Sequence, residues 1–283
     1  MTSHNTAPNQ FVELGDVRYA YRRFGRPGGT PILLLQHFIG TMDWWDPLLT
    51  DGLAKTREVI LFDNRGVGLT SGETPNRIAA MAADVHAFIH ALGLAQVDVL
   101  AFSIGGFVGQ ELALTYPDDV RKLILAGTGP RGGQGMQAPR QDVVDALSLG
   151  DHSKARAYLF FSQSENGQAE AKAFLARTGE RKRDLDPESS IQTMQAQSEA
   201  IGEWGLLDSH TDFLAKLRTL EHPTLVVNGN DDIMVATPNS YTLAQAIPKA
   251  QLVIYPDSGH GALFQYADLL VQHINLFLDQ SDI

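Results

Sequence analysis

Hydrophobic residues fall into short continuous runs along this chain, and segments with helical periodicity separate most of the runs. A run of this length, bounded by polar or turn-forming residues, is typical of a strand that is buried on both faces of a sheet. We therefore expect a mostly parallel sheet. The runs occupy residues 31–36, 58–63, 97–102, 122–127, 223–229 and 251–256.

Two other patterns complete the predicted sheet. Residues 11–25 alternate between apolar and polar side chains around Gly15 and Asp16, which predicts a β-hairpin and brings the sheet to about eight strands. Apolar residues then recur at helical spacing between the second and third runs, and again at the end of the chain. Alternating strands and helices indicate an α/β doubly wound fold with helices on both faces. The helical stripes consist of Ile78, Met81, Ala82, Val85, Phe88, Ile89 and Leu92, and of Leu270, Ile274, Phe277 and Leu278.

One interval interrupts this alternation. Between about Gly129 and Arg218 the sequence contains helix-like segments and no convincing strand. The interval follows a strand, and loops at the carboxyl ends of parallel strands surround the ligand crevice of such sheets. We interpret it as an inserted helical cap at residues 130–218, between a first core segment at 1–129 and a second at 219–283.

Composition narrows the range of partners and compartments. The chain has 22 basic and 33 acidic residues among 283, and only the short stretch 181–183 is rich in basic residues, so a nucleic-acid partner is not expected. It contains no cysteine, which excludes disulfides and thiolate chemistry. The N-terminus is polar, and no apolar run is long enough to cross a bilayer. We expect a cytoplasmic protein without a membrane partner, for which a homo-oligomer is compatible with the sequence.

Ser103 is the first candidate for chemistry. It follows an apolar run directly and precedes a helix-like run, with Ala101 and Gly105 two residues away on either side. A sharp turn from strand to helix projects a serine into the crevice and leaves room only for small residues at these two positions. The same turn aims the backbone N–H of Ile104 at the space above the serine, where it can bind an oxyanion.

An acid and a base follow the serine in the order that such a site requires. "NGNDD" at 228–232 follows one apolar run, and "DSGH" at 257–260 follows the next. These loops place an aspartate and His260 at adjacent strand ends. The residues themselves leave the acid open between Asp231 and Asp232.

Five stretches in this order resemble the α/β-hydrolase fold superfamily over nearly the whole chain. The resemblance implies a triad of Ser103, Asp232 and His260, because members commonly place the acid three residues after the glycine that ends the strand. It also implies an oxyanion hole formed by the amides of Phe38 and Ile104. The chain departs from the usual pattern at His37, where a glycine is common, and at Ala101, where small size is sufficient. The stretches are "LLLQHFIG" (33–40), "DNRGVGLTSG" (63–72), "AFSIGG" (101–106), "NGNDD" and "DSGH".

A serine nucleophile in this family implies acyl transfer without a cofactor. We expect a serine hydrolase that cleaves a carboxylic ester or lactone of a small, largely apolar molecule through an acyl-enzyme on Ser103. A cofactor-free perhydrolase or haloperoxidase-like enzyme, and a ligand receptor with little turnover, are the alternatives. The residues expected to line the substrate pocket are His37, Ile39, Trp44, Phe107, Phe160 and Phe161.

Two further histidines have the spacing of metal ligands. His86 and His90 lie four residues apart on the predicted helix that precedes the third apolar run. The sequence places no carboxylate or third ligand next to them. We therefore interpret them as surface histidines and expect no metal.

Overall fold

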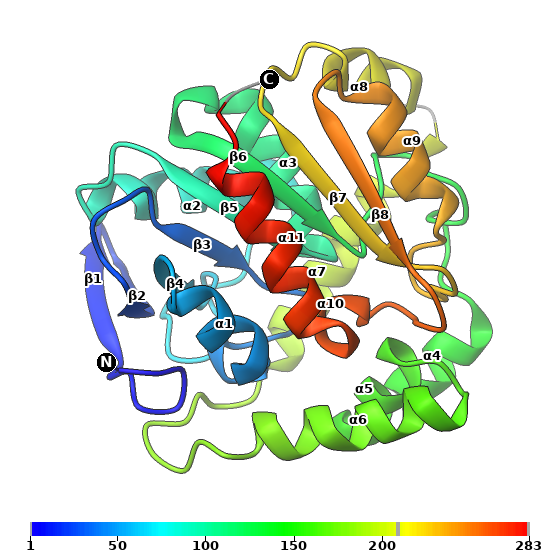
Figure 1. Cartoon of the computed structure of the whole chain (residues 1–283), viewed down its shortest axis with the longest axis horizontal. Coiled ribbons are helices and arrows are strands. Elements are labelled where there is room, and N and C mark those ends of the chain that lie inside the picture. Colours follow the sequence, from blue (N-terminus) through cyan, green and yellow to red (C-terminus); the bar gives the residue numbers. More distant parts are fainter. Residues whose placement is uncertain (1, 208–209, 282–283) are drawn as a thin grey trace.

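The computed structural model describes residues 2–207 and 210–281 and has the predicted α/β architecture (Figure 1). Eight strands form one sheet in the order β1-β2-β4-β3-β5-β6-β7-β8. The first two pairings are antiparallel, and every pairing from β4 to β8 is parallel. The strands are β1 Gln10–Leu14, β2 Val17–Gly25, β3 Ile32–Leu35, β4 Glu58–Phe62, β5 Val97–Phe102, β6 Val120–Ala126, β7 Thr224–Gly229 and β8 Ala250–Tyr255.

The strand at β8 differs from its prediction. Its hydrophobic run predicts burial on both faces, but most of its residues are only half-buried, and Ile254 is 38% exposed. β8 is the last strand of the sheet, so packing surrounds it on one side only. The central strands β3, β5 and β7 are buried along their whole length, as predicted.

Helices cover both faces of the sheet and bury alternate residues of each strand. Leu34 packs in one layer with α1 and α11, whereas its neighbour Leu33 packs in the other layer with α2, α3 and α9. In Figure 1, α1 and α11 lie in front of the sheet, and α2 and α3 lie behind it. The core helices are α1 Pro47–Ala54, α2 Ile78–Ala91, α3 Ile104–Thr115, α9 Pro238–Ala246, α10 Ala262–Gln265 and α11 Ala267–Asp279, with short 3-10 turns η1 Met42–Trp44 and η2 Pro117–Asp119.

Within the described residues, the interval from 129 to 218 contains helices and no strand, as the sequence predicts. α4, α5 and α6 lie together along the lower side of Figure 1, and β7 and β8 point toward them. α7 packs instead beside α3, where Trp204 stacks on Phe107 with ring centres 5.1 Å apart. Phe213 of α8 packs against the same Trp204, with ring centres 4.8 Å apart. The boundaries of the cap stay a prediction, and its residues 208 and 209 lie outside the described residues. The helices are α4 Gln141–Leu147, α5 His152–Phe160, α6 Glu165–Thr178, α7 Ile191–Trp204 and α8 His210–Leu217.

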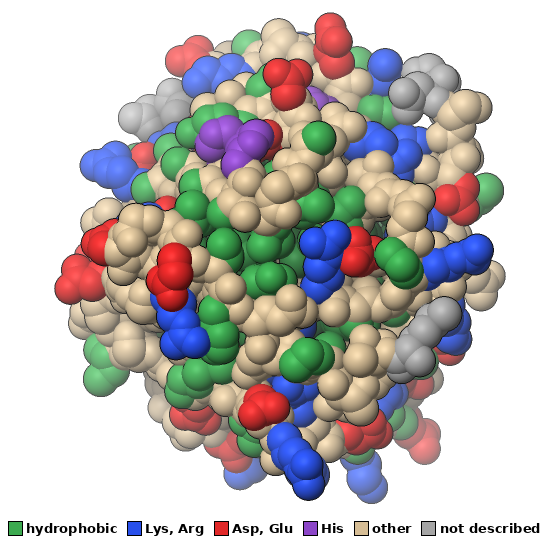
Figure 2. Space-filling model, turned by 90° about the vertical axis from the view of Figure 1, so that its left-hand side faces the viewer, with side chains coloured by type: hydrophobic (Ala, Val, Ile, Leu, Met, Phe, Trp, Pro, Cys, Tyr) green, Lys and Arg blue, Asp and Glu red, His purple; other side chains and the backbone are tan. Residues whose placement is uncertain are grey.

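The surface is mixed in charge. On the face that Figure 2 shows, Lys and Arg side chains are scattered among Asp and Glu side chains. Over the part of the chain that the structure describes, no helix combines the length and the apolar character needed to span a membrane.

Candidate active site

Ser103 occupies a strained turn between β5 and α3. Its backbone angles are φ 58° and ψ −121°, in a region that non-glycine residues rarely adopt. Two hydrogen bonds hold this conformation: the Ser103 N–H donates to the carbonyl of Ala126 (3.0 Å), and Thr128 Oγ1 donates to the Ser103 carbonyl (2.9 Å). Both partners belong to the end of β6 or the residues after it, so the adjacent strand fixes the turn.

The small residues around the serine are required by close packing. A Cβ atom on Gly105 would lie 2.3 Å from the carbonyl oxygen of Leu35, which is backbone and cannot move aside. A Cβ atom on Gly109 would lie 3.0 Å from the methyl group of the fully buried Ala101. The start of α3 therefore sits directly against β3 and β5, which brings Ser103 to the carboxyl end of the sheet.

His260 and Asp232 are buried and hydrogen-bonded to each other. His260 Nδ1 lies 2.8 Å from Asp232 Oδ2, and the N–H groups of Met234 (2.8 Å) and Val235 (3.0 Å) donate to Asp232 Oδ1. An ionised carboxylate can only accept, so Nδ1 carries the proton and Nε2 presents its lone pair. Asp231, the other aspartate of this loop, is exposed.

Nε2 of His260 is buried and has no hydrogen-bond partner among the described residues. His260 and Ser103 line the same cavity. The ring of His260 packs against Phe102, with ring centres 4.9 Å apart, and Phe160 (5.8 Å). Nε2 therefore has no competing hydrogen-bond partner among the described residues at the cavity that His260 and Ser103 line.

The loop after β3 presents a free amide next to Ser103. Gln36 accepts from the N–H of His37 (2.9 Å), and Gln197 of α7 accepts from the N–H of Ile39 (2.6 Å). The N–H of Phe38, between them, donates to no acceptor within the described chain. Ile104 is the first residue of α3, so its N–H has no partner inside the helix. The two amides expected to form the oxyanion hole are therefore both available.

Gln197 is a residue that the sequence analysis did not identify. It belongs to α7 and is buried, and its side-chain oxygen holds Ile39, whose φ of 52° is unusual for a β-branched residue. Ser189 Oγ donates to the carbonyl of Ile39 (2.8 Å). The loop after β3 at residues 36–40, which we call the oxyanion loop for the role expected of it, is thus held from the predicted cap. No local sequence pattern indicates a contact over 158 positions.

His37 lies fully within the protein beside the site. Burial, and secondly the positive charge of Arg156, lower the pKa of His37 to about 3, so its imidazole is neutral near neutral pH. Its Nδ1 lies 3.0 Å from the carbonyl oxygen of Phe38, and its Nε2 has no partner among the described residues. The ring contacts Trp44 and Phe160, with centres 5.5 and 5.1 Å away. His37 both braces the loop and lines the cavity.

Two cavities meet at Ser103 and Phe38. The larger has a volume of about 230 Å³ and is lined mainly by apolar side chains, including Phe107. The smaller has a volume of about 30 Å³. Both linings are mainly apolar, and Leu147 and Met234 belong to both. The larger cavity also has Gln137, Arg140 and Ser198 in its lining, and the smaller has Arg156 and three histidines. The apolar lining of the larger cavity includes Met136, Val143, Leu147, Ile201 and Met234, and the smaller is lined by His37, Ile39, Trp44, His152, Arg156, Phe160 and His260 among others.

Arg156 is the charged group of the smaller cavity, and the sequence analysis missed it. Its guanidinium lies 4.2 Å from the centre of the Trp44 ring, and its Nε donates to the carbonyl of His152 (3.2 Å). No carboxylate forms an ion pair with it among the described residues. Burial lowers the pKa of Arg156 to about 10, so it stays charged near neutral pH. A partly buried cation with one backbone partner can bind an acceptor in the cavity.

Phe160 and Phe161 have different surroundings. Phe160 lines the smaller cavity and contacts the rings of His37 and His260. Phe161 lines neither cavity: it is buried against Phe174 of α6, with ring centres 5.4 Å apart. Successive residues at the end of a helix point in different directions, so only one of the pair faces Ser103. The expectation of a pocket position for Phe161 is therefore not met by its packing.

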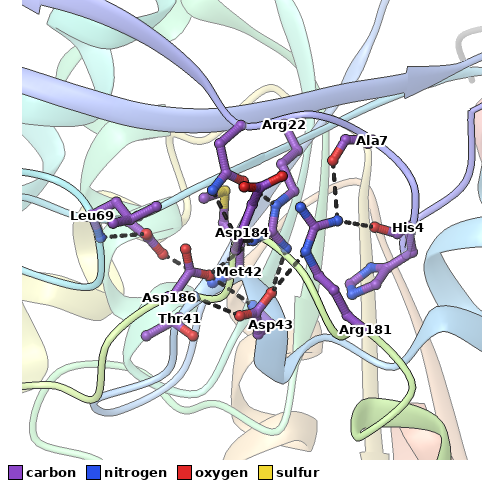
Figure 3. A network of polar contacts seen from close by, with 12 residues as sticks. His4, Ala7, Arg22, Thr41, Met42, Asp43, Leu69, Arg181, Asp184 and Asp186 are labelled. Carbon is purple, nitrogen blue, oxygen red and sulfur yellow. Dashed lines mark hydrogen bonds and ion pairs between the residues drawn. The ribbon is translucent and has the colours of Figure 1, made fainter.

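A buried polar network supports the oxyanion loop from behind (Figure 3). Arg22, which is fully buried, donates to Asp43 (2.5 Å) and to Asp186 (3.3 Å). Arg181 donates to backbone carbonyls of the N-terminal segment, at His4 (3.1 Å) and Ala7 (3.0 Å). The network joins β2, η1, the N-terminal segment and the loop before α7. It fixes the base of the loop that carries Phe38.

Asp63, the first residue of the "DNRGVG" stretch, directly follows β4 and joins this network to the end of that strand. Its carboxylate accepts from the N–H groups of Met42 (2.9 Å) and Leu69 (3.1 Å). Burial, and secondly the negative charge of Asp186, raise the pKa of Asp63. Burial likewise raises the pKa of Asp186, to about 6. Asp63 and Asp186 therefore favour a state in which at least one of the two carboxyl groups is protonated.

Comparison with known proteins shows the family to which this fold belongs. A family model described as the alpha/beta hydrolase fold matches residues 30–266. The solved structure of an alpha/beta hydrolase fold protein from Chitinophaga pinensis is 42% identical, covers 99% of this chain and 100% of its own, and superimposes with a TM-score of 0.91. A protein of Azorhizobium caulinodans named "Putative carbamate hydrolase RutD" is 30% identical, over 84% of this chain and 86% of its own length. The structure titled Est816, an N-acyl homoserine lactone degrading enzyme, is 25% identical over 95% of this chain and 100% of its own, with a TM-score of 0.70.

Proposed function

The chain belongs to the alpha/beta hydrolase fold family, and on this basis we propose that it is a serine hydrolase that cleaves a carboxylic ester or a lactone through an acyl-enzyme on Ser103. The observation that carries the proposal is the pairing of His260 with Asp232. It leaves Nε2 of His260 as an unpartnered acceptor in the cavity that Ser103 lines. A base in this state is what a serine hydroxyl needs to become a nucleophile.

The reaction has two balanced halves. His260 Nε2 takes the Ser103 proton as Oγ bonds to the substrate carbonyl carbon, and the N–H groups of Phe38 and Ile104 donate to the oxyanion. The bond to the leaving oxygen then breaks, and His260 returns the proton to that oxygen. In the second half, water gives a proton to His260 and attacks the acyl-enzyme. Ser103 regains its proton as the carboxylic acid leaves.

The two cavities support a substrate with one apolar part and one part that carries an acceptor. The larger cavity, of about 230 Å³, has a mainly apolar lining that suits a short acyl chain or a ring, although Arg140 also lines it. In the smaller cavity, Arg156 and the neutral His37 suit a carboxylate or carbonyl group. We propose that Arg156 binds such a group and positions the ester against Ser103.

Steady-state turnover tests this function. We expect a panel of short aryl esters and lactones to be hydrolysed with many product molecules per protein, and Ser103→Ala to remove that turnover. One equivalent of product followed by a stop would indicate a ligand receptor. Turnover that requires hydrogen peroxide and a carboxylic acid would indicate a perhydrolase.

A further inference from the structure

Two histidines of α2 and one aspartate of η2 come together on the surface. His86 Nδ1 lies 2.6 Å from Asp119 Oδ2, and His90 Nε2 lies 2.9 Å from Asp119 Oδ1. From the sequence, both histidines are interpreted as surface residues without a carboxylate nearby, and that premise is wrong. The fold brings Asp119 against both, although it follows His90 by 29 positions.

The geometry of the three residues is that of a convergent ligand set. The histidines are four residues apart on one helix, so both rings lie on the same face. One donor atom from each of the three residues lies within 4.8 Å of the others. An ion at about 2.0–2.2 Å from each donor holds neighbouring donors roughly 3–3.5 Å apart, so the hydrogen-bonded N···O pairs must widen by less than ~1 Å and donors as far apart as 4.8 Å must approach each other by more than ~1 Å. Side-chain rotation of His90, which is half exposed, can supply this movement.

The surroundings of Asp119 favour a cation. Its side chain is only 5% exposed, and the two imidazoles are the groups that its carboxylate contacts within the described residues. A buried carboxylate without a fixed positive partner is unfavourable unless a proton or a metal ion compensates its charge. Tyr116 stacks on His86, with ring centres 4.0 Å apart and planes at 9°, so this imidazole is held in place before an ion binds.

We propose that His86, His90 and Asp119 form a binding site for one divalent transition-metal ion. Two imidazole nitrogens and one carboxylate oxygen are the donor set that suits Zn²⁺, Ni²⁺ or Cu²⁺, whereas Mg²⁺ and Ca²⁺ prefer oxygen donors. The histidines face solvent, which leaves room for water to complete the coordination.

The position of the site indicates a structural role. Asp119 directly precedes β6 and so lies at the amino end of this strand, whereas Ser103 follows the carboxyl end of β5. Because β5 and β6 are parallel neighbours, the two sites lie at opposite ends of the strands. The ion would join α2 to the connection between α3 and β6. It would stabilise the folded chain by binding it in preference to the unfolded chain.

Zinc titration of the metal-free protein tests the proposal. At pH 7.5 we expect one equivalent of Zn²⁺ to bind with a Kd in the micromolar range or below, and to raise the thermal midpoint. His86→Ala and His90→Ala should each weaken binding at least tenfold and abolish the rise in the thermal midpoint. His273→Gln, on α11, is the matched control and should bind Zn²⁺ as the unchanged protein does.

Two further measurements test whether zinc binds at His86, His90 and Asp119 and not elsewhere on the protein. Protein labelled at Ser103 with a phosphonate should retain the zinc equivalent, because the label blocks the vicinity of His260 and leaves α2 untouched. Asp119→Asn, provided that its circular dichroism is native, should also weaken binding. Binding that survives both histidine substitutions, or the absence of a saturable equivalent in the unchanged protein, would overturn the proposal.

Discussion

Nδ1 of His260 lies 2.8 Å from Oδ2 of Asp232, and two backbone N–H groups occupy the other oxygen of that carboxylate. The carboxylate therefore cannot rotate away without losing three hydrogen bonds. This arrangement orients the imidazole from one side only. The opposite nitrogen, Nε2, has no partner among the described residues, as the proposed chemistry at Ser103 requires.

Asp232→Asn should lower kcat by about 10³-fold or more, because an amide in this position can donate to Nδ1 and so favours the wrong imidazole tautomer. Asp231→Asn is the matched control, since Asp231 is exposed and should leave kcat nearly unchanged. Rates of ester hydrolysis for the two variants provide the comparison. Equal losses would contradict the assignment of Asp232.

Ser103→Ala should lower ester hydrolysis by about 10⁵-fold or more while the protein stays folded, because the acyl-enzyme cannot form. An alanine is also smaller than serine at this strained turn, so the packing against α3 is preserved. A phosphonate should add to Ser103 in the unchanged protein, as peptide mass spectrometry can show. Label on a different residue would contradict the assignment of Ser103 as the nucleophile.

Phe160→Ala and Phe161→Ala should have different effects. Phe160 lines the smaller cavity, so its truncation should change the ratio of kcat/KM between short and long esters by about tenfold or more, equivalent to ~1–3 kcal/mol. Phe161 packs on Phe174 away from both cavities, so its truncation should reduce the free energy of unfolding by about 3–5 kcal/mol and leave that ratio unchanged. A changed ratio for Phe161→Ala alone would contradict this division.

The sequence predicts the sheet well because each buried strand is a local apolar run. It also predicts the turn at Ser103, because Gly105 must be small where it meets the backbone of Leu35. The partners of Gln197 and Arg156 could not be predicted in this way. Each acts through a contact with a segment far away in the chain, and neither stands in a local pattern that differs from an ordinary surface helix.

Arg156→Met should raise KM for esters that carry a carboxylate, by about tenfold to a hundredfold, and change KM little for their methyl-ester counterparts. Methionine keeps the apolar stem and removes the charge. Arg156→Lys is the matched control, because it keeps the charge and should retain part of the preference. Equal KM changes for charged and neutral substrates would indicate that Arg156 only packs against Trp44.

The buried network behind the oxyanion loop should make stability depend on pH through Asp186. Burial raises the pKa of this carboxyl group from its ordinary value of 3.8 to about 6 in the folded protein. Between these two values the folded protein binds more protons at this residue than the unfolded chain does. The free energy of unfolding that Asp186 contributes is therefore fully present below pH 3.8 and is lost as the pH rises through 6.

Asp186→Asn removes this contribution, together with the effect that the charge of Asp186 has on the pKa of Asp63. The amide has nearly the same shape and can still accept from Arg22 and from the N–H of Asp43. The other titrating groups of the network remain in both proteins, including His4, whose pKa burial lowers to about 3. We expect the stability of the unchanged protein, relative to Asp186→Asn, to fall as the pH rises from 4 to 7. Urea unfolding of both proteins at several pH values measures this difference. A difference that is constant or rises over that range would show that Asp186 is ionised in the folded state, held by Arg22, and that the network carries a full ion pair instead of a shared proton.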